Sequence, residues 1–143
     1  MGAEVRVISL DVGTKTIGVA ATDPLGMLAH PVCTVSRKGV KKDVVVLQGI
    51  LDEKQATAVV VGLPYELDGT EERSARLARQ IGVAVEESSG LPVHYVDERF
   101  SSVEAERRMI EAGVSRKKRK QVIDQVAAVI ILETWLSMNK ERP

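Results

Sequence analysis

The stretch EVRVISLDVGTKTIGVAAT, residues 4–22, has the pattern of two β-strands joined by a short turn. Residues 4–12 predict a buried strand that ends next to an acidic residue, and residues 16–22 predict a second strand after the turn at Gly13. A turn containing proline and glycine then precedes a third strand pattern over residues 27–35. Three strands joined by short turns predict an antiparallel meander.

The hydrophobic period changes after this meander, and helical segments alternate with short apolar strands. We expect helices over residues 39–55, 71–88, 101–112 and 120–138, and strands over residues 56–62 and 91–98. This order predicts an α/β fold with a five-stranded mixed sheet. Three antiparallel strands are followed by parallel strands, and helices flank both faces.

Length and composition limit the classes of protein that need to be considered. The 143 residues fit one domain spanning residues 1–143, and the single cysteine, Cys33, rules out an internal disulfide. The sequence shows no signal peptide and no long apolar run, so we expect a cytoplasmic protein without a membrane partner. Twenty basic and twenty acidic residues, with only 3% aromatics, argue against coating of nucleic acid by bulk charge or by stacking.

Two acidic positions follow predicted strands. Asp11 ends the first strand on the same face as Ser9, and Gly13 would let a phosphate approach the backbone. A turn or capping role for Asp11 is the alternative. Asp97 and Glu98 close the last strand with their side chains on opposite faces. The alternation leaves open which of the two is functional.

Asp124 is the third acidic position, and it lies on a predicted helix. Ala128, Ile131 and Trp135 share its side of the helix, so Asp124 should face the sheet. A buried carboxylate must be protonated, paired or bound to a cation, and a salt bridge to Arg or Lys is the alternative to a metal role. If three carboxylates converge at one sheet edge, hard oxygen ligands favour Mg²⁺ or Mn²⁺.

Basic residues close to these acids are candidates for phosphate contacts. Five consecutive cations lie just before the helix that carries Asp124, and repulsion among them should keep the segment mobile until a polyanion arrives. A solvated surface is the alternative. Lys15, close after Asp11, is a further candidate, whereas His30 and His94 are expected to be structural. The five cations are Arg116, Lys117, Lys118, Arg119 and Lys120.

Four blocks of sequence resemble the YqgF/RuvX family. They are DVGTKTIGVAATD at 11–23, VVVGLPYELDGTE at 59–71, VDERFSSVEAE at 96–106 and IDQVAAVIILETWL at 123–136. The resemblance implies a ribonuclease H-like fold and a metal-dependent nuclease site at Asp11, Glu98 and Asp124, which selects Glu98 over Asp97. It also implies nucleic acid as partner, with Arg99 beside Glu98 as another phosphate contact.

Members of that family are described as Holliday junction resolvases and as nucleases that mature precursor 16S rRNA. The resemblance therefore implies structured RNA or branched DNA as substrate, with ribosomal particles as further partners. Symmetric junction resolution would require a homodimer, whereas RNA cleavage is compatible with a monomer.

Two other functional classes are open. One is a non-catalytic nucleic-acid-binding factor for ribosome assembly with the same fold. The other is an ATPase, because DVGTKTIGVA is similar to the first phosphate loop of the actin and Hsp70 superfamily. The chain is too short for that two-domain architecture and lacks a second glycine-rich phosphate loop.

Overall fold

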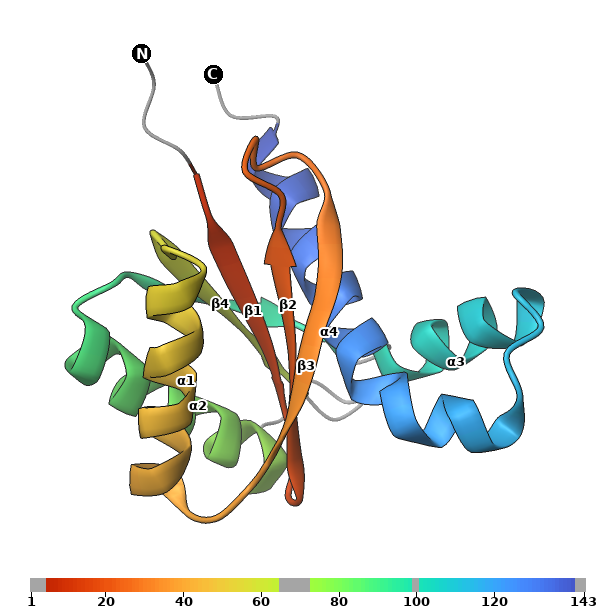
Figure 1. Cartoon of the computed structure of the whole chain (residues 1–143), viewed down its shortest axis with the longest axis horizontal. Coiled ribbons are helices and arrows are strands. Elements are labelled where there is room, and N and C mark those ends of the chain that lie inside the picture. The colour runs from red at the N-terminus through yellow and green to blue at the C-terminus, as the bar shows by residue number, and fades with distance from the viewer. Residues whose placement is uncertain (1–4, 65–72, 99–100, 141–143) are drawn as a thin grey trace.

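A computed structural model describes residues 5–64, 73–98 and 101–140 of the chain. Within these ranges, five strands form one sheet with helices on both faces (Figure 1). The elements are β1 (Val7–Val12), β2 (Thr16–Thr22), β3 (Ala29–Ser36), α1 (Val40–Glu53), β4 (Ala58–Leu63), α2 (Arg73–Ser89), β5 (Val93–Asp97), α3 (Ser101–Glu111) and α4 (Arg116–Lys140).

The strand order across the sheet is β3-β2-β1-β4-β5. The pairs β1–β2 and β2–β3 are antiparallel, whereas β1–β4 and β4–β5 are parallel. The predicted α/β fold with an antiparallel meander and two parallel strands is therefore confirmed. Every residue of β4 is buried, as expected for a strand whose two faces are both covered by helices.

Two apolar layers hold the helices on the sheet. On one face, Leu47 of α1 and Ile81 of α2 pack against alternate residues of the strands, such as Leu10. On the other face, Ala128 and Ile131 of α4 pack in a second apolar cluster. Figure 1 shows α1 and α2 together on one side of the sheet and α4 on the other, with α3 projecting from α4 away from the sheet.

The long helix α4 contains a stretch that is apolar and long enough to cross a membrane, by length and composition alone. A helix in the core of a globular domain meets the same criterion. Here Ala127 and Ala128 are 0% exposed, and Ile131 and Leu132 are at most 1% exposed, against the sheet and α3. One side of α4 therefore packs into the domain, while most of the helix surface is exposed or half-buried.

The structure corrects the expected start of the last helix, because the basic run lies within that helix and not before it. Arg116 is already the first residue of α4. The Ser115 hydroxyl accepts a hydrogen bond from the Lys118 amide at 3.2 Å, and the Ser115 carbonyl accepts one from the Arg119 amide at 2.9 Å. Lysine and arginine also favour helix intrinsically. This capping and propensity outweigh the mutual repulsion of the cations in solvent.

Candidate active site

Asp11 lies in β1 on the face that α4 covers. Val7 belongs to the apolar cluster on that face, and the Ser9 hydroxyl donates a hydrogen bond of 2.7 Å to the Ala128 carbonyl of α4. Side chains alternate along a strand, so Asp11 shares this face with both. The β1–β2 register places Asp11 directly opposite Gly18.

Glu98 comes immediately after β5, and its amide donates a hydrogen bond of 3.0 Å to the Leu63 carbonyl at the end of β4. This bond extends the parallel pairing by one residue and holds Glu98 beside the sheet. The Glu98 residue is only 8% exposed, whereas Asp97 is exposed, so the two lie on opposite faces as predicted. Gly62 makes room for Glu98, because a Cβ at Gly62 would lie 2.9 Å from the Glu98 Cδ.

Asp124 lies in α4 where that helix crosses the β-hairpin. The Thr16 hydroxyl of β2 donates a hydrogen bond to its carboxylate, and Gln125 donates one of 2.9 Å to the Thr34 hydroxyl of β3. Gly18 of β2 lies beneath the Asp124 backbone. Helix spacing predicted that Asp124 faces the sheet, and these contacts confirm it.

The pKa of Asp11 reflects the charges of the other two acids. Burial raises the pKa of Asp11 well above its ordinary value, and the negative charges of Glu98 and Asp124 raise that pKa further. A hydrogen bond between the side chains of Asp11 and Glu98 acts in the same direction. Asp11 therefore lies close enough to both Glu98 and Asp124 to feel their charges, although the three residues are distant in the sequence.

A hydrogen bond between two carboxyl groups requires a proton on one of them, because an ionised carboxylate can only accept. That proton neutralises part of the negative charge of the three acids. A bound cation could neutralise the same charge in its place. The described residues contain no group of three or more His, Cys, Asp or Glu side chains already arranged to hold a metal ion. The donor chemistry nevertheless suits a hard divalent cation, since oxygen ligands and excess negative charge occur together.

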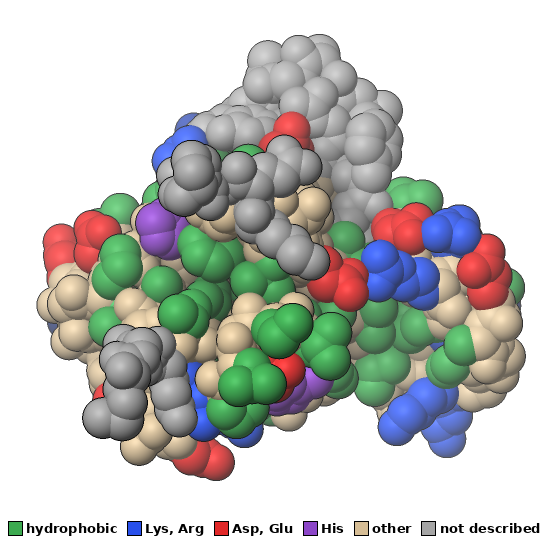
Figure 2. Space-filling view, turned by 90° about the horizontal axis from the view of Figure 1, so that it is seen from above, with side chains coloured by type: hydrophobic (Ala, Val, Ile, Leu, Met, Phe, Trp, Pro, Cys, Tyr) green, Lys and Arg blue, Asp and Glu red, His purple; other side chains and the backbone are tan. Residues whose placement is uncertain are grey.

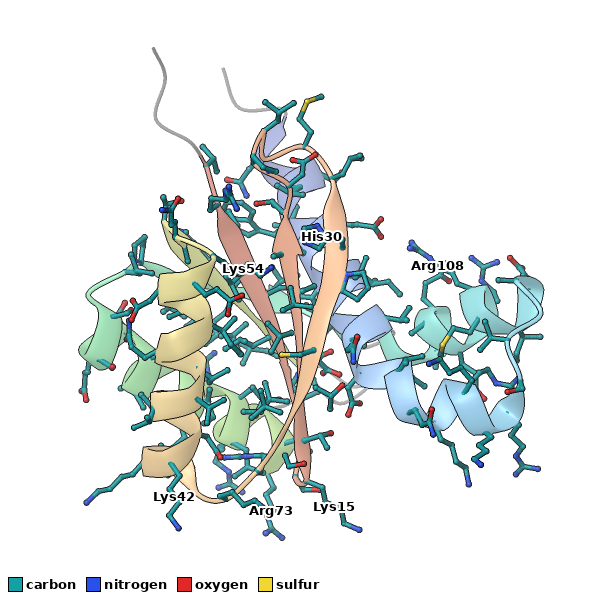
Figure 3. The ribbon with its side chains drawn as sticks, viewed as in Figure 1. Lys15, His30, Lys42, Lys54, Arg73 and Arg108 are labelled. Atoms are coloured by element: carbon teal, nitrogen blue, oxygen red, sulfur yellow. The ribbon has the colours of Figure 1, made fainter. Side chains whose placement is uncertain are left out.

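Basic side chains lie at two places near this acidic cluster. Lys15 is exposed in the turn between β1 and β2, and Figure 3 shows it projecting from the end of the molecule. Four cations in the first turns of α4 are exposed, namely Arg116, Lys117, Lys118 and Lys120. Arg119 is half-buried and donates a hydrogen bond of 2.8 Å to the Val114 carbonyl. Arg99, the remaining predicted contact, lies outside the described residues.

The arginines of α3, unlike the exposed cations at the start of α4, form ion pairs with glutamates. Arg107 pairs with Glu104 at 2.5 Å and with Glu111 at 2.7 Å, and Arg108 pairs with Glu133 of α4 at 2.8 Å. Figure 2 shows acidic and basic side chains interleaved on this projecting part of the molecule. This region is therefore a mixed-charge surface, in which the Arg108–Glu133 pair joins α3 to α4, unlike the start of α4.

Three residues that support the acidic cluster were not identified from the sequence: Thr16, Gly18 and Gly62. The hairpin register could have indicated two of them, because it places Gly18 opposite Asp11 and puts Thr16 on the same face. Gly62 depends on the approach of Ile131 and Glu98 from other elements. No local pattern in the sequence signals that approach.

Relatives of the chain are recognised along nearly its full length. Residues 5–138 match the sequence profile of the family described as RuvX: Holliday junction resolvase. A Myxococcus xanthus protein provisionally named pre-16S rRNA nuclease is 44% identical over 135 residues, which cover 94% of this chain and 89% of that protein. A Clostridioides difficile protein with the same provisional name is 47% identical over 131 residues, covering 92% of this chain and 93% of that protein.

Two solved structures share the fold at low sequence identity. Thermus thermophilus RuvC, in complex with a Holliday junction substrate, has a TM-score of 0.56 and 17% identity, covering 94% of this chain and 95% of RuvC. The fowlpox virus resolvase, in complex with Holliday junction DNA, has a TM-score of 0.54 and 13% identity, covering 96% of this chain and 100% of that protein. These likenesses identify a ribonuclease H-like fold, and together with the matches in sequence they show that the chain belongs to the RuvX family of Holliday junction resolvases.

Proposed function

We propose that this protein is a divalent-metal-dependent endonuclease that hydrolyses phosphodiester bonds in structured nucleic acid. The observation that carries the proposal is the meeting of Asp11, Glu98 and Asp124, with the exposed cations at the start of α4 on the same helix as Asp124. A buried carboxyl group whose pKa is raised by two neighbouring carboxylates favours binding of a cation, and nearby basic side chains bind the phosphates of a polyanion.

Asp11, Glu98 and Asp124 would hold Mg²⁺ or Mn²⁺. Such ions activate a water molecule and stabilise the leaving oxygen in a phosphoryl displacement. The Thr16 hydroxyl orients Asp124, and the buried position of Glu98 restricts its carboxylate to few orientations. Lys15 and the exposed residues of the basic run position the nucleic-acid backbone by charge.

Two substrates follow from the relatives. The provisional name of the curated relatives points to precursor 16S rRNA, and the family description points to four-way DNA junctions. We propose the 5′ end of precursor 16S rRNA as the first candidate, in the context of ribosomal particles, and the DNA junction as the second. Both present phosphodiester bonds next to double-helical segments.

The test is a cleavage assay that offers a precursor 16S rRNA fragment and a four-way DNA junction in competition, with Mg²⁺ or Mn²⁺. We expect wild type to cleave at least one of them, and Asp11→Asn and Asp124→Asn to lose more than about 100-fold in rate, beyond the ~10–100-fold typical of groups that only support metal ligands. Asp97→Asn is the matched control, since Asp97 neighbours Glu98 but is exposed on the other face.

The outcomes of these assays distinguish the proposed site, the alternative function and the oligomeric state. Equal rates for wild type, Asp11→Asn and Asp124→Asn would rule out the proposed site. Binding of both substrates without cleavage by wild type would instead favour the non-catalytic assembly factor. Measuring the molecular mass in solution with and without the junction would distinguish a monomer from the homodimer that symmetric junction cleavage requires.

A further inference from the structure

A furrow runs along α2, on the face of the sheet opposite α4. It is lined by the arginines Arg73, Arg76 and Arg79, together with Leu77, Gln80 and Val83. The three arginines recur every three residues and therefore lie on neighbouring turns of one side of the helix. Arg73 and Arg76 are exposed, whereas the Arg79 guanidinium lies 5.1 Å from the centre of the Tyr95 ring.

The furrow continues towards the turn between β1 and β2. A second hollow shares Arg73, Leu77 and Gln80 with the first and extends to Thr14. Lys15 follows Thr14 in the chain, and Figure 3 shows Lys15, Lys42 and Arg73 projecting from the same end of the molecule. We call the two connected hollows the α2 furrow.

The described residues that line the α2 furrow are basic or neutral, although the net charge of the chain is zero. None of the described residues that line either hollow is acidic. Arg37 also lines it, but its guanidinium pairs with Asp43 at 3.1 Å and donates to the Gly13 carbonyl at 3.0 Å. The exposed guanidinium groups of Arg73 and Arg76 can form paired hydrogen bonds with phosphate oxygens.

Two surfaces that carry exposed cations are connected to the acidic cluster through elements of the fold, since α4 also carries Asp124. The basic run lies in the first turns of α4, which in Figure 1 extend beyond the sheet beside α3, and the α2 furrow lies on the sheet face opposite α4. The β1–β2 hairpin joins them, since β1 carries Asp11 and the turn that follows borders the furrow at Thr14. Two segments that diverge near the scissile bond, as the arms of a branched molecule do, could reach both surfaces at once.

We propose that the α2 furrow binds the phosphate backbone of a second double-helical arm of a branched nucleic acid, while the start of α4 contacts the arm that is cut. The proposal rests on the proposed function for the identity of the ligand. It adds a surface that selects branched over linear double helices. Because the contacts are to phosphates, the surface positions the arm without reading its sequence.

The test compares binding of a four-way DNA junction with binding of a linear duplex equal to one arm, by fluorescence anisotropy without divalent cations, across a range of salt concentrations. The variant is Arg73→Gln/Arg76→Gln. Its matched control is Lys41→Gln/Lys54→Gln, which removes the same charge from the first turn and the C-terminal cap of α1. Glutamine has nearly the same helix propensity as arginine and lysine, so we expect both double variants to fold.

We expect the furrow variant to bind the junction about tenfold more weakly than the control at intermediate salt. The slope of log affinity against log salt should fall by about two, because each lost phosphate contact contributes roughly 0.9. Affinity for the single duplex should stay within about twofold of the control. Junction binding equal to that of the control would overturn the proposal, and so would an equal loss of affinity for the duplex.

This readout is independent of catalysis. If wild type cleaves neither substrate but the furrow variant lowers the salt slope of junction binding, the proposed nuclease is refuted and the second-arm surface stands. If the protein cleaves normally and the furrow variant has the same salt slope as the control, the proposed nuclease stands and the second-arm surface is refuted.

Discussion

Gly18 and Asp124 lie in direct contact, because a Cβ atom on Gly18 would be 2.0 Å from the Asp124 carbonyl oxygen and 2.8 Å from the Asp124 Cβ. Gly18 is also the residue directly opposite Asp11 in the β1–β2 register. The missing side chain therefore lets α4 lie against the hairpin at the point where two of the three acids must meet. Close packing of backbone on backbone at this position determines the spacing of the acidic cluster.

Gly18→Ala should accordingly destabilise the protein and impair the site. The added methyl group must displace α4 backbone, and overpacking of this kind costs about 1–3 kcal/mol or more. Gly49→Ala is the matched control, since nothing lies within 4 Å of a Cβ at that position in α1. Alanine there should increase the free energy of unfolding by about 0.5–1 kcal/mol. Urea denaturation checks both values, and wild-type stability and cleavage in Gly18→Ala would contradict the packing argument.

Thr16 should act as a positioning residue for Asp124. Its hydroxyl donates to the Asp124 carboxylate, so Thr16→Val removes the donor while keeping the shape of the side chain. We expect kcat to fall about tenfold with KM little changed, within the range for groups that orient metal ligands. Thr16→Ser restores the hydroxyl and should restore kcat. Equal kcat values for the valine and serine variants would show that the hydroxyl has no part in the reaction.

Asp11→Asn should stabilise the metal-free protein at neutral pH. Burial and the charges of Glu98 and Asp124 raise the pKa of Asp11 in the folded state above its unfolded value. The protonated form therefore stabilises the fold at low pH, and this contribution is lost as pH rises through the folded-state pKa. Asparagine resembles the protonated form at every pH.

The advantage of asparagine should be absent at about pH 3 and grow to about 3 °C or more in Tm at neutral pH, which is about 1 kcal/mol for a chain of this size. Melting curves in EDTA across that pH range measure it. Added Mg²⁺ should raise the Tm of wild type more than that of the variant, because binding to the folded state alone is stabilising. A lower Tm for Asp11→Asn at neutral pH in EDTA would contradict the expected repulsion.

Local periodicity predicted the relative orientation of the acidic residues of the site. Strand alternation put Asp11 on the face of Ser9 and separated Asp97 from Glu98, and helical spacing put Asp124 towards the sheet. Alternation alone could not select Glu98, because it gives relative and not absolute orientation. That choice depends on the bond from the Glu98 amide to the Leu63 carbonyl, which aligns β5 with β4.

The rest of the site depends on contacts that have no local signature. Asp124 and its partner Thr16 are 108 residues apart in the chain. The start of α4 was missed for a different reason, because repulsion between the cations was weighed without the cap that Ser115 supplies. Exposed charges repel weakly in water, so capping and helix propensity decided the conformation.

A buried ion pair should stabilise the turn that follows Asp11. Asp43 of α1 has a side chain only 1% exposed, accepts from Arg37 at 3.1 Å, and accepts from the Lys38 amide at 2.8 Å. Arg37 in turn donates to the Gly13 carbonyl at 3.0 Å, so the pair ties the β1–β2 turn to the start of α1. Asp43→Asn leaves the Arg37 charge without its partner in a largely buried position.

Removing one member of such a pair costs about 3–5 kcal/mol, whereas replacing both by apolar residues is often nearly neutral. We therefore expect Asp43→Asn and Arg37→Met each to lower the free energy of unfolding by about 3 kcal/mol. The double variant Arg37→Met/Asp43→Leu should lose clearly less than the sum of the two single losses. Urea denaturation of the three variants and wild type measures the coupling. Additive losses would mean that the pair contributes nothing beyond separate packing of the two side chains, and that the turn after Asp11 is held by other contacts.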